Sequence, residues 1–519
     1  MADTYDVIII GSGPGGGTMA LELAPTGKRI LLLERGDYLK RERANWSSQA
    51  VFVDGKYQCP DVWHDRDGHS FHPGLHYVVG GNSKVYGGSL YRLRLEDFGE
   101  LRHEEGVSPA WPVGYDVFEP YYTRAERLFQ VHGTRGADPT EPWARAPYPH
   151  PAVRHEPRIQ ALADGLSRIG HHPYPQPLAI LLDENENGAK PHSPCIRCDA
   201  FDGYPCLVNG KADAQIVAVD PAREYPNVTL LTGAYVDRLE TDASGRTVTG
   251  VHVVRGGVPE VYRADIVVVA CGALSSALLM LRSASDAHPN GLANGSGLVG
   301  RNYMRHNNSA FMAVSLEPND TVFQKTLALS DFYFGADDYD FPLGEIQMIG
   351  KSHGDQVKAE GLSSWLSFFP NWPFDQLARH SLDFWVMTED LPRRDNRIYY
   401  RDGQVVLDVQ PTGAKPHKLL RHKLEGLLSK IDAHPHLLPR SLYLGKDVAI
   451  GGTAHQAGTM VFGEDPATSV LDLDCRAHEI DNLYCTDAGF FPSIAAVNPT
   501  LTIIANAMRV ADHLKARMG

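Results

Sequence analysis

The sequence predicts an α/β fold in which one parallel sheet is built from segments far apart in the chain. Three observations support this. Residues 5–10 form an apolar run of strand length, followed at once by a glycine cluster and a helix-like stretch. Residues 227–271 hold further strand patterns, and residues 485–514 hold a glycine-containing loop and a long apolar helix. The regions between are richer in Pro, Trp and Tyr, which favours a second unit of mixed sheet and helix (α+β).

Length and composition exclude several classes of protein. The chain has 519 residues, of which 43 % are hydrophobic and 22 % charged, so a disordered or coiled-coil protein is not expected. Its net charge is −14 without a basic cluster, so no nucleic-acid partner is expected. The apolar stretches are shorter than the roughly 20 residues of a membrane helix. Seven cysteines and a start without a basic, signal-like region predict a cytoplasmic protein without a disulfide framework.

The N-terminal glycines have the spacing of a dinucleotide site. Gly11, Gly13 and Gly16 fit G-x-G-x-x-G, which serves a tight turn, the approach of a pyrophosphate and close packing of helix on strand. The start of the following helix favours an anion. Glu34 ends the second strand 21 residues after Gly13, where a carboxylate can accept hydrogen bonds from ribose hydroxyls. These residues alone leave open whether the dinucleotide is NAD or FAD.

The middle of the chain favours FAD. Residues 227–240, 248–254 and 260–271 read as strands separated by turns, and a helix follows from residue 272. A cofactor domain assembled from separated pieces, with a substrate unit inserted between them, is typical of FAD enzymes. We therefore expect an FAD-binding domain at 1–100, 200–310 and 440–519, and a substrate-binding domain at 101–199 and 311–439.

The C-terminal region supplies candidate catalytic side chains. A strand is expected to end at Asp487, and Asn498-Pro499-Thr500 is a strong start signal for the last helix. The positive end of that helix would stabilise a reduced, anionic flavin. His455 stands 43 residues before Asn498 and has the chemistry of a base for an alcohol proton, while an amide can hold the alkoxide oxygen.

Several blocks together resemble one family. GGNSKVYGGSLYRLRLEDF, WPVGYDVFEPYYTRAE, GTAHQAGT and DAGFFPSIAAVNPTLTIIANAMRVAD resemble the glucose-methanol-choline (GMC) flavoprotein oxidoreductases over nearly the whole chain. CIRCDAFDGYPCLVNGKADA and MTEDLPRRDNRI most resemble the bacterial pyranose-oxidase-like branch, which includes glycoside 3-oxidases and sugar 3-dehydrogenases. The fold implied is a Rossmann-like FAD domain with an inserted sheet-and-helix substrate domain, as in p-hydroxybenzoate hydroxylase.

The resemblance also implies roles for single residues. It places the catalytic pair on His455 and Asn498. Fungal pyranose oxidases attach flavin through a histidine, where this chain has Lys84-Val85-Tyr86, so we expect non-covalent FAD. The residues implied or expected to contact the cofactor are Gly11, Gly13, Gly16, Glu34, Gly81, Asn82, Ser83, Val236, Asp487, Ala488, Pro499 and Thr500.

Three features remain open or are expected to be structural. Cys195, Cys198 and Cys206, with His192 nearby, could ligate a metal or cluster, but a packed loop is preferred and no metal is expected. Gln347 is a candidate substrate contact. It could form a sugar-binding wall with nearby aromatic residues, or these could belong to the core: Trp365, Trp372, Phe374 and Trp385. The acidic run Glu389-Asp390, followed by Arg393, Arg394 and Arg397, is expected to form a solvated turn with ion pairs.

The expected function is oxidation of a secondary hydroxyl of a sugar or glycoside to a ketone, as a pyranose 2-oxidase or glycoside 3-oxidase does. His455 would take the proton, flavin N5 the hydride, and O2 or a quinone the electrons. Two alternatives remain: a dehydrogenase that passes electrons to a protein or quinone, and a GMC-fold lyase that keeps FAD for structure. A nicotinamide enzyme is disfavoured because it has no use for the dispersed segments.

Overall fold

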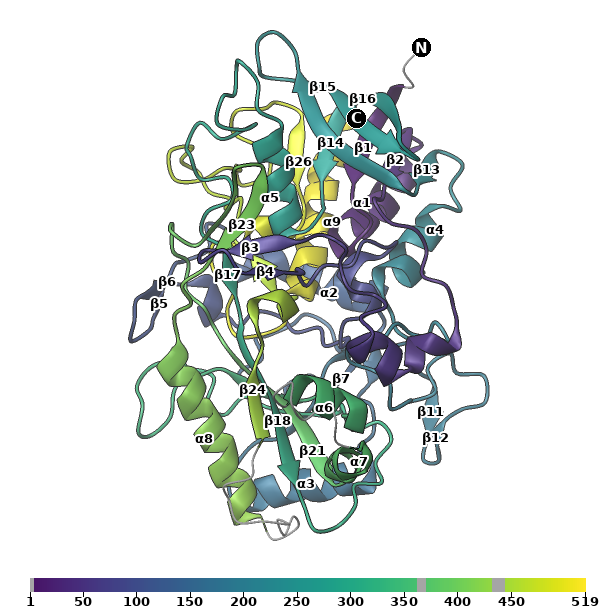
Figure 1. Ribbon diagram of the computed structural model, residues 1–519, viewed down its shortest axis with the longest axis vertical. Coiled ribbons are helices and arrows are strands. Elements are labelled where there is room, and N and C mark those ends of the chain that lie inside the picture. Colours follow the sequence, from purple (N-terminus) through teal and green to yellow (C-terminus); the bar gives the residue numbers. More distant parts are fainter. Residues whose placement is uncertain (1–3, 362–369, 432–443) are drawn as a thin grey trace.

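The structure, a computed structural model, describes residues 4–361, 370–431 and 444–519. Two sheets lie at opposite ends of the molecule, with the long C-terminal helix α9 (Thr500–Met518) extending from the middle toward the first of them (Figure 1). The first sheet has seven strands and the second has six. The polypeptide crosses between the two ends more than once, so each sheet combines segments distant in sequence.

The seven-stranded sheet contains the first strand of the chain and one of the last. Its order is β13-β2-β1-β16-β15-β14, and β26 pairs with β16. β13, β2, β1, β16 and β26 are parallel to one another, whereas β14 and β15 extend the sheet as antiparallel strands. The bounds are β1 Thr4–Ile10, β2 Ile30–Leu33, β13 Val228–Leu231, β14 Ala234–Thr241, β15 Val248–Arg255, β16 Val258–Val269 and β26 Leu483–Cys485. The predicted α/β fold class is confirmed.

Helices α1 (Pro14–Leu23) and α9 begin beside one another at this sheet. A Cβ on Gly15 would fall on the carbonyl oxygen of Thr486 and would lie 3.4 Å from the side chain of Ile503. The absence of a side chain at Gly15 therefore lets the first turn of α1 approach both the tail loop and the first turn of α9. Helix α5 (Ala273–Arg282) follows β16 at the position expected from the sequence.

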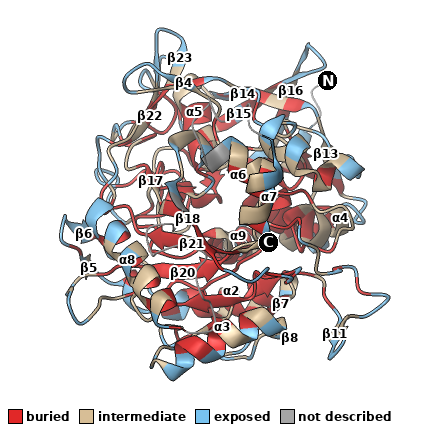
Figure 2. Cartoon of the chain, turned by 60° about the horizontal axis from the view of Figure 1, so that its bottom comes forward, coloured by how far each residue is buried: buried red, intermediate tan, exposed pale blue. Residues whose placement is uncertain are grey.

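The six-stranded sheet carries a separate core. Its order is β24-β18-β21-β20-β19-β9. Apolar residues of helices α3 and α8 pack with Phe311, Ile346 and Phe384 of its strands, and Figure 2 shows these helices with buried inner faces. Side chains alternate along a strand, so Gln347 projects to the other face from Ile346. The bounds are β9 Tyr174–Pro175, β18 Asn307–Val314, β19 Leu327–Leu329, β20 Glu345–Met348, β21 Ser381–Thr388, β24 Leu444–Asp447, α3 Pro157–Arg168 and α8 Ala414–Lys430.

Smaller elements complete the described chain. A four-stranded sheet has the order β22-β23-β3-β4, and β17 pairs with β25. Their bounds are β3 Trp63–Asp65, β4 Ser70–Phe71, β17 Met304–Arg305, β22 Arg397–Arg401, β23 Gln404–Asp408 and β25 Gln456–Ala457. The other helices are α2 Tyr115–Leu128, α4 Asp220–Ala222, α6 Gly354–Gly361 and α7 Trp372–Arg379. Short strand pairs are β5 Leu101–Arg102 with β6 Val107–Ser108, β7 Val131–Gly133 with β8 His150–Pro151 and β10 Leu178–Ala179, and β11 Glu184–Asn185 with β12 Gly188–Ala189.

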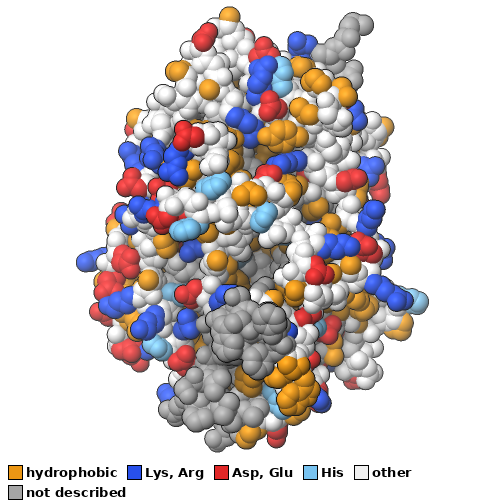
Figure 3. Space-filling view, in the orientation of Figure 1, with side chains coloured by type: hydrophobic (Ala, Val, Ile, Leu, Met, Phe, Trp, Pro, Cys, Tyr) orange, Lys and Arg blue, Asp and Glu red, His pale blue; other side chains and the backbone are white. Residues whose placement is uncertain are grey.

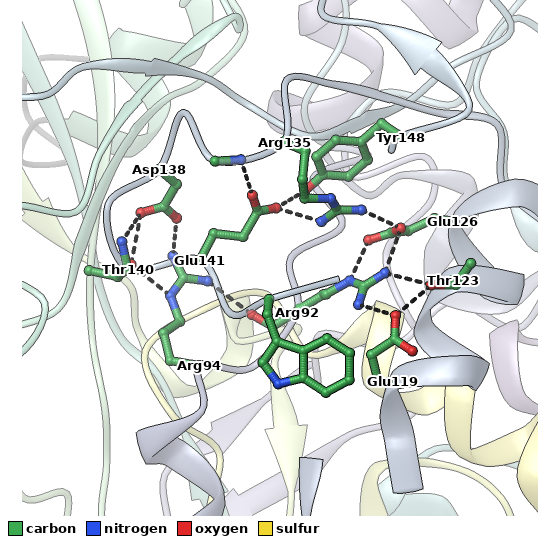
Figure 4. Close-up of polar contacts among 12 residues, drawn as sticks. Arg92, Arg94, Glu119, Thr123, Glu126, Arg135, Asp138, Thr140, Glu141 and Tyr148 are labelled. Atoms are coloured by element: carbon green, nitrogen blue, oxygen red, sulfur yellow. Dashed lines mark hydrogen bonds and ion pairs between the residues drawn. The ribbon is translucent and has the colours of Figure 1, made fainter. Parts of the chain in front are cut away.

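A buried ionic network fixes the segment after residue 90 to α2 (Figure 4). The guanidinium of Arg92 donates to both carboxylate oxygens of Glu126, at 2.7 and 2.9 Å, and to Glu119. Arg135 donates to the same Glu126 and to Glu141. Because buried charges are tolerated only when paired and hydrogen-bonded, this network explains Arg92 of one block that carries the family resemblance and Glu119 and Glu126 of another.

Arg393 and Arg394 of the expected solvated turn are exposed, but the expectation is wrong for Glu389 and Asp390. Both residues are buried, with 4 % and 0 % of their surface exposed. Asp390 accepts hydrogen bonds from the backbone and hydroxyl of Thr412, and burial raises its pKa to about 6. The pair follows β21 directly, so it stays inside the fold where a surface pattern suggested a turn. Its partners come from distant segments that the local sequence does not reveal.

The aromatic candidates among the described residues differ in burial and in position. Phe374 is buried beside Met312, whereas Trp372 at the start of α7 is 69 % exposed. Trp385 lies on β21 directly opposite Gln347. Trp365 lies outside the described residues. Trp385 is thus the aromatic side chain whose strand position matches the expected substrate contact.

Among the described residues, no helix is long and apolar enough to cross a membrane. Acidic and basic side chains are interspersed over the face drawn in Figure 3. The cytoplasmic location stays a prediction, as does the division into two domains.

Candidate active site

A glycine cradle lies where β1 meets α1. Gly11 has φ +100°, and a Cβ there or at Gly16 would collide with a backbone carbonyl, of Ala270 and of Gly11 respectively. Gly13 differs, because no atom lies within 4 Å of the position of its Cβ. Gly13 is also the N-cap of α1, with Pro14 following. The helix start is thus open on one side and closed on the other, which is the shape required by a backbone that approaches a phosphate.

Glu34 lies beside this cradle. Its carboxylate accepts hydrogen bonds from the backbone and hydroxyl of Ser12, at 3.1 and 2.6 Å, and from the backbone of Gly36 at 2.9 Å. Burial raises the pKa of Glu34. The Ser12 hydroxyl also accepts a hydrogen bond from the backbone of Gly80. One serine therefore joins the predicted ribose-binding carboxylate to the loop that contains Gly81.

The loop at Gly81–Lys84 closes over the cradle. A Cβ on Gly81 would lie 3.2 Å from the Cα of Gly13. The side chains of the other two predicted loop residues are already engaged: Asn82 donates to the carbonyl of Gly74, and Ser83 donates to that of Gly80. The side chains of Asn82 and Ser83 are therefore occupied within the protein, as is the backbone N–H of Gly81, which donates to the carbonyl of Val78.

The tail contributes a second polar group to the same region. Asp487 accepts hydrogen bonds from the backbones of Gly272 and Gly489 and from the hydroxyl of Ser276. Burial raises the pKa of Asp487. The neighbouring Thr486 hydroxyl is buried without a partner among the described residues. Such an unpartnered group costs free energy unless something bound there satisfies it.

The backbone carbonyls of two further predicted cofactor residues, Ala488 and Val236, accept hydrogen bonds within the protein. Ala488 accepts a hydrogen bond from the backbone of Gly458. Val236 lies on β14, and its carbonyl accepts a hydrogen bond from Arg282 at 2.8 Å. That carbonyl is thus engaged within the protein.

His455 lies opposite a second histidine, which sequence reasoning missed. In the antiparallel pair β17–β25, Met304 faces Ala457 and Arg305 faces Gln456. Continuing this register places His306 opposite His455, and their Nδ1 atoms are 2.8 Å apart. The rings meet edge to face, with centroids 4.9 Å apart.

Asn498 lies on the other side of His455. The Nδ2 of Asn498 is 3.5 Å from the Nε2 of His455. A contact of that length is weak, so both atoms retain capacity toward a third group. The Nε2 of Gln347 donates to the Oδ1 of Asn498 at 3.1 Å, which turns the Asn498 amide nitrogen toward His455. The Oε1 of Gln347 is buried without a partner among the described residues.

The loop before Asn498 is held by distant side chains. Ala495 has φ +57°, a strained conformation for a residue with a Cβ. Its N–H donates to Glu389 at 3.0 Å, and the N–H of Ala496 donates to the hydroxyl of Tyr333 at 3.1 Å. The carbonyl of Ala495 accepts from the Nε2 of His306 at 2.9 Å. These three contacts together hold the backbone in the conformation that positions Asn498.

Burial and charge keep His455 neutral. Desolvation lowers its pKa well below 6.5, with smaller contributions from His306 and the Lys325 ammonium. Desolvation also lowers the pKa of His306 to about 4. A neutral imidazole beside an amide donor can accept a proton from a hydroxyl group and hold the resulting oxygen.

The cysteine-rich loop does not form a metal cage. The described residues contain one group of three His, Cys, Asp or Glu side chains close enough to share an ion, namely Asp65, Asp67 and His69, which are largely exposed. Cys195, Cys198 and Cys206 carry free thiols, and His192 is exposed. The packed-loop interpretation and the expected absence of a metal stay predictions.

The fold and the site together define a dinucleotide-binding α/β protein with a histidine–amide pair. The GMC oxidoreductase N-terminal and C-terminal family models match residues 15–308 and 438–507. The N-terminal match covers more than half of the chain, so the protein belongs to the GMC oxidoreductase family, and the expected family membership is confirmed.

Similar proteins agree with this assignment. The chain is 32 % identical to a 6'''-hydroxyparomomycin C oxidase of Streptomyces lividus, over 99 % of this chain and 92 % of that protein. It is 30 % identical to a paromamine 6'-oxidase of Streptomyces fradiae, over 98 % and 90 %. A crystal structure of pyridoxine 4-oxidase from Mesorbium loti superposes with a TM-score of 0.66, at 18 % identity and 98 % coverage of both chains, which supports the fold alone.

Proposed function

We propose that this GMC oxidoreductase uses non-covalent FAD to oxidise a hydroxyl of a sugar, glycoside or aminoglycoside to a carbonyl. One observation carries the proposal. The glycine cradle lies at the start of α1, Asn498 lies just before α9, and the first turns of these two helices approach each other at Gly15 and Ile503. His455 lies 3.5 Å from Asn498, so the proposed phosphate site and the proposed base–amide pair lie in one region of the protein.

The residues present fit FAD. The open side of Gly13 admits a pyrophosphate, Glu34 stands where a ribose is bound in related folds, and the unpartnered Thr486 hydroxyl offers a further polar contact. FAD bound there would supply the hydride acceptor. Gly11, Gly16, Gly81 and Asp487 would shape the site. The remaining proposed contacts are Asn82, Ser83, Val236, Ala488, Pro499 and Thr500.

The chain's own residues would handle the substrate oxygen and its proton. The Nε2 of His455 takes the hydroxyl proton, and the Nδ2 of Asn498 donates a hydrogen bond to the oxygen that becomes negative. Since Gln347 engages the Oδ1 of Asn498, the amide cannot turn its oxygen toward that charge without losing this bond. The free Oε1 of Gln347 can accept a hydrogen bond from a second hydroxyl or an amino group of the substrate.

The sequence-based expectation of a secondary hydroxyl and a ketone product stays a prediction. The two oxidases reported above are named for the 6''' and 6' positions of aminoglycosides. We therefore include both sugars and aminoglycosides in the proposed substrate class. The acceptor of the electrons is proposed to be O2 or a quinone.

An anaerobic substrate panel tests the proposal. Purified holoenzyme is mixed with monosaccharides, O- and C-glycosides and aminoglycosides, while loss of the oxidised-flavin absorbance is recorded and the product position is determined by NMR. We expect bleaching by at least one sugar-like alcohol. A colourless protein that takes up no FAD, or a flavin bleached by none of these alcohols, would contradict the proposal.

Two other functions give different results in the same assay. A GMC-fold lyase would turn over its substrate without bleaching the flavin. A dehydrogenase would bleach the flavin anaerobically but would consume no O2 when air is admitted, whereas an oxidase would. Acid precipitation distinguishes the binding mode, because non-covalent FAD stays in the supernatant and covalent FAD stays in the pellet.

A further inference from the structure

His306 makes two well-defined contacts through its two ring nitrogens. Its Nε2 lies 2.9 Å from the carbonyl oxygen of Ala495, and its Nδ1 lies 2.8 Å from the Nδ1 of His455. The ring is almost fully buried, with 1 % of its surface exposed. We propose that His306 is a positioning residue that fixes the tautomer of His455, an inference that rests on the proposed role of His455 as the base.

The Ala495 carbonyl sets the proton position on His306. A carbonyl oxygen only accepts hydrogen bonds, so the Nε2 of His306 must carry the hydrogen. A neutral imidazole carries one N–H, which leaves the Nδ1 of His306 as an acceptor. The second imidazole in contact with that Nδ1 must therefore be the donor.

The proton position on His455 follows from this. Its Nδ1 carries the hydrogen and donates to His306, so its Nε2 has a free lone pair. The other neighbour of Nε2 agrees, because the Asn498 nitrogen 3.5 Å away is a donor. In the opposite tautomer, an N–H would face the amide N–H of Asn498, and two ring acceptors would face each other at Nδ1. Both contacts would be repulsive, and no base would face the substrate.

Burial keeps the rings of His306 and His455 neutral, which is the charge state from which both tautomers were assigned. Burial lowers the pKa of His306 to about 4, although the carboxylate of Glu389 acts in the opposite direction. Burial, His306 and the Lys325 ammonium all lower the pKa of His455. His455 therefore takes the substrate proton as an uncharged ring, and the imidazolium formed at His455 keeps its hydrogen bond to the Nδ1 of His306.

Two isosteric variants separate the contacts of His306. In the His306→Gln variant, the amide nitrogen can still donate to the Ala495 carbonyl, but no acceptor remains for the Nδ1 of His455. In the His306→Asn variant, the amide oxygen stands near the lost Nδ1 and still accepts from His455. We expect flavin reduction to slow by about 10-fold to 100-fold in the Gln variant and by no more than about 3-fold in the Asn variant. The rate of flavin reduction in the His306→Gln variant should be lower at every pH at which His455 is neutral in the wild type, with little change in the apparent substrate affinity.

His417→Gln is the matched control. His417 is also buried, its pKa is also lowered by burial to about 4, and it contacts Ser309 and Thr388 but not His455. Flavin content and melting temperature are measured for all three variants. Equal rate losses in the Gln and Asn variants of His306, or a loss in His417→Gln as large as that in His306→Gln, would reduce His306 to a packing role and overturn the inference.

Neutron diffraction on deuterated wild-type crystals gives a readout that does not depend on activity. A deuteron on the Nδ1 of His455 and on the Nε2 of His306 is expected, and a deuteron on the Nε2 of His455 would overturn the inference. The His455→Ala variant distinguishes a failure of the proposed function from a failure of the positioning role. If His455→Ala reduces its flavin at the wild-type rate, the proposed function fails; if only His306→Gln does so, the positioning role fails alone.

Discussion

The glycine cradle and the Asn498 loop are built in different ways. The cradle is local: Gly11, Gly13 and Gly16 lie within six residues, a Cβ at Gly11 or Gly16 would meet a backbone carbonyl, and the position at Gly13 is open. The loop before Asn498 is instead held from outside, by His306, Tyr333 and Glu389. The comparison shows that the glycine cradle is encoded within one segment, whereas the orientation of the proposed catalytic pair depends on the whole fold.

Glycine substitutions in the cradle should have the largest effect. A Cβ on Gly16 would meet the carbonyl of Gly11 in the same turn, so Gly16→Ala should cost about 3 kcal/mol of stability or more. Gly13→Ala should leave the apoprotein as stable as wild type, because no atom lies within 4 Å of the added methyl, but it should weaken FAD binding. Thermal unfolding and FAD titration of both variants test this. A Gly13→Ala variant that binds FAD normally would show that the pyrophosphate lies elsewhere.

Removing the base should have the next largest effect. We expect His455→Ala to slow anaerobic flavin reduction by about 100-fold to 10,000-fold, and Asn498→Ala by about 10-fold to 1,000-fold, with FAD still bound. Stopped-flow absorbance measures both rates, and flavin content per chain is the control. A His455→Ala variant that loses its FAD but keeps its rate after reconstitution would reverse the roles of the two regions.

This difference also explains what the sequence could predict. The strand and glycine patterns that predict the positions of Gly11 and Glu34 depend on only a few neighbouring residues. The start of α9 is likewise predicted by the adjacent pair Asn498-Pro499. His306 carries no local signal, because its meaning comes from the register of β17 against β25 and from a carbonyl 189 residues away. The buried state of Glu389 was missed for the same reason, since its partners Ser108 and Ala495 come from distant segments.

A smaller effect is expected where the loop is held by a hydroxyl. Tyr333→Phe removes the acceptor for the Ala496 N–H and the donor to Asp97, and it should cost about 1–3 kcal/mol of stability. Tyr400→Phe, on an exposed tyrosine, should cost less than about 0.5 kcal/mol. Denaturant unfolding of both variants measures the difference. Equal losses would mean that the hydroxyl of Tyr333 does not support the loop.

The smallest expected effect is a shift in pH dependence. Because the pKa of His455 is lowered well below 6.5, flavin reduction should be constant through neutral pH and fall only under more acidic conditions. The Lys325 ammonium contributes to that lowering, so Lys325→Met should raise the pKa and move the acidic limb to higher pH, by less than about one unit. Lys40→Met, on an exposed lysine, is the control. A limb that moves to lower pH in Lys325→Met would contradict the assignment of that limb to His455.

A crystal structure of the FAD-loaded enzyme with a sugar-like alcohol would show whether the flavin and the His455–Asn498 pair meet at the same substrate carbon. We expect the flavin N5 on one side of the substrate hydroxyl carbon, and the His455 Nε2 and the Asn498 Nδ2 both within hydrogen-bonding distance of the hydroxyl oxygen. A substrate oxygen in contact with neither side chain, or a flavin ring bound away from this pair, would contradict it.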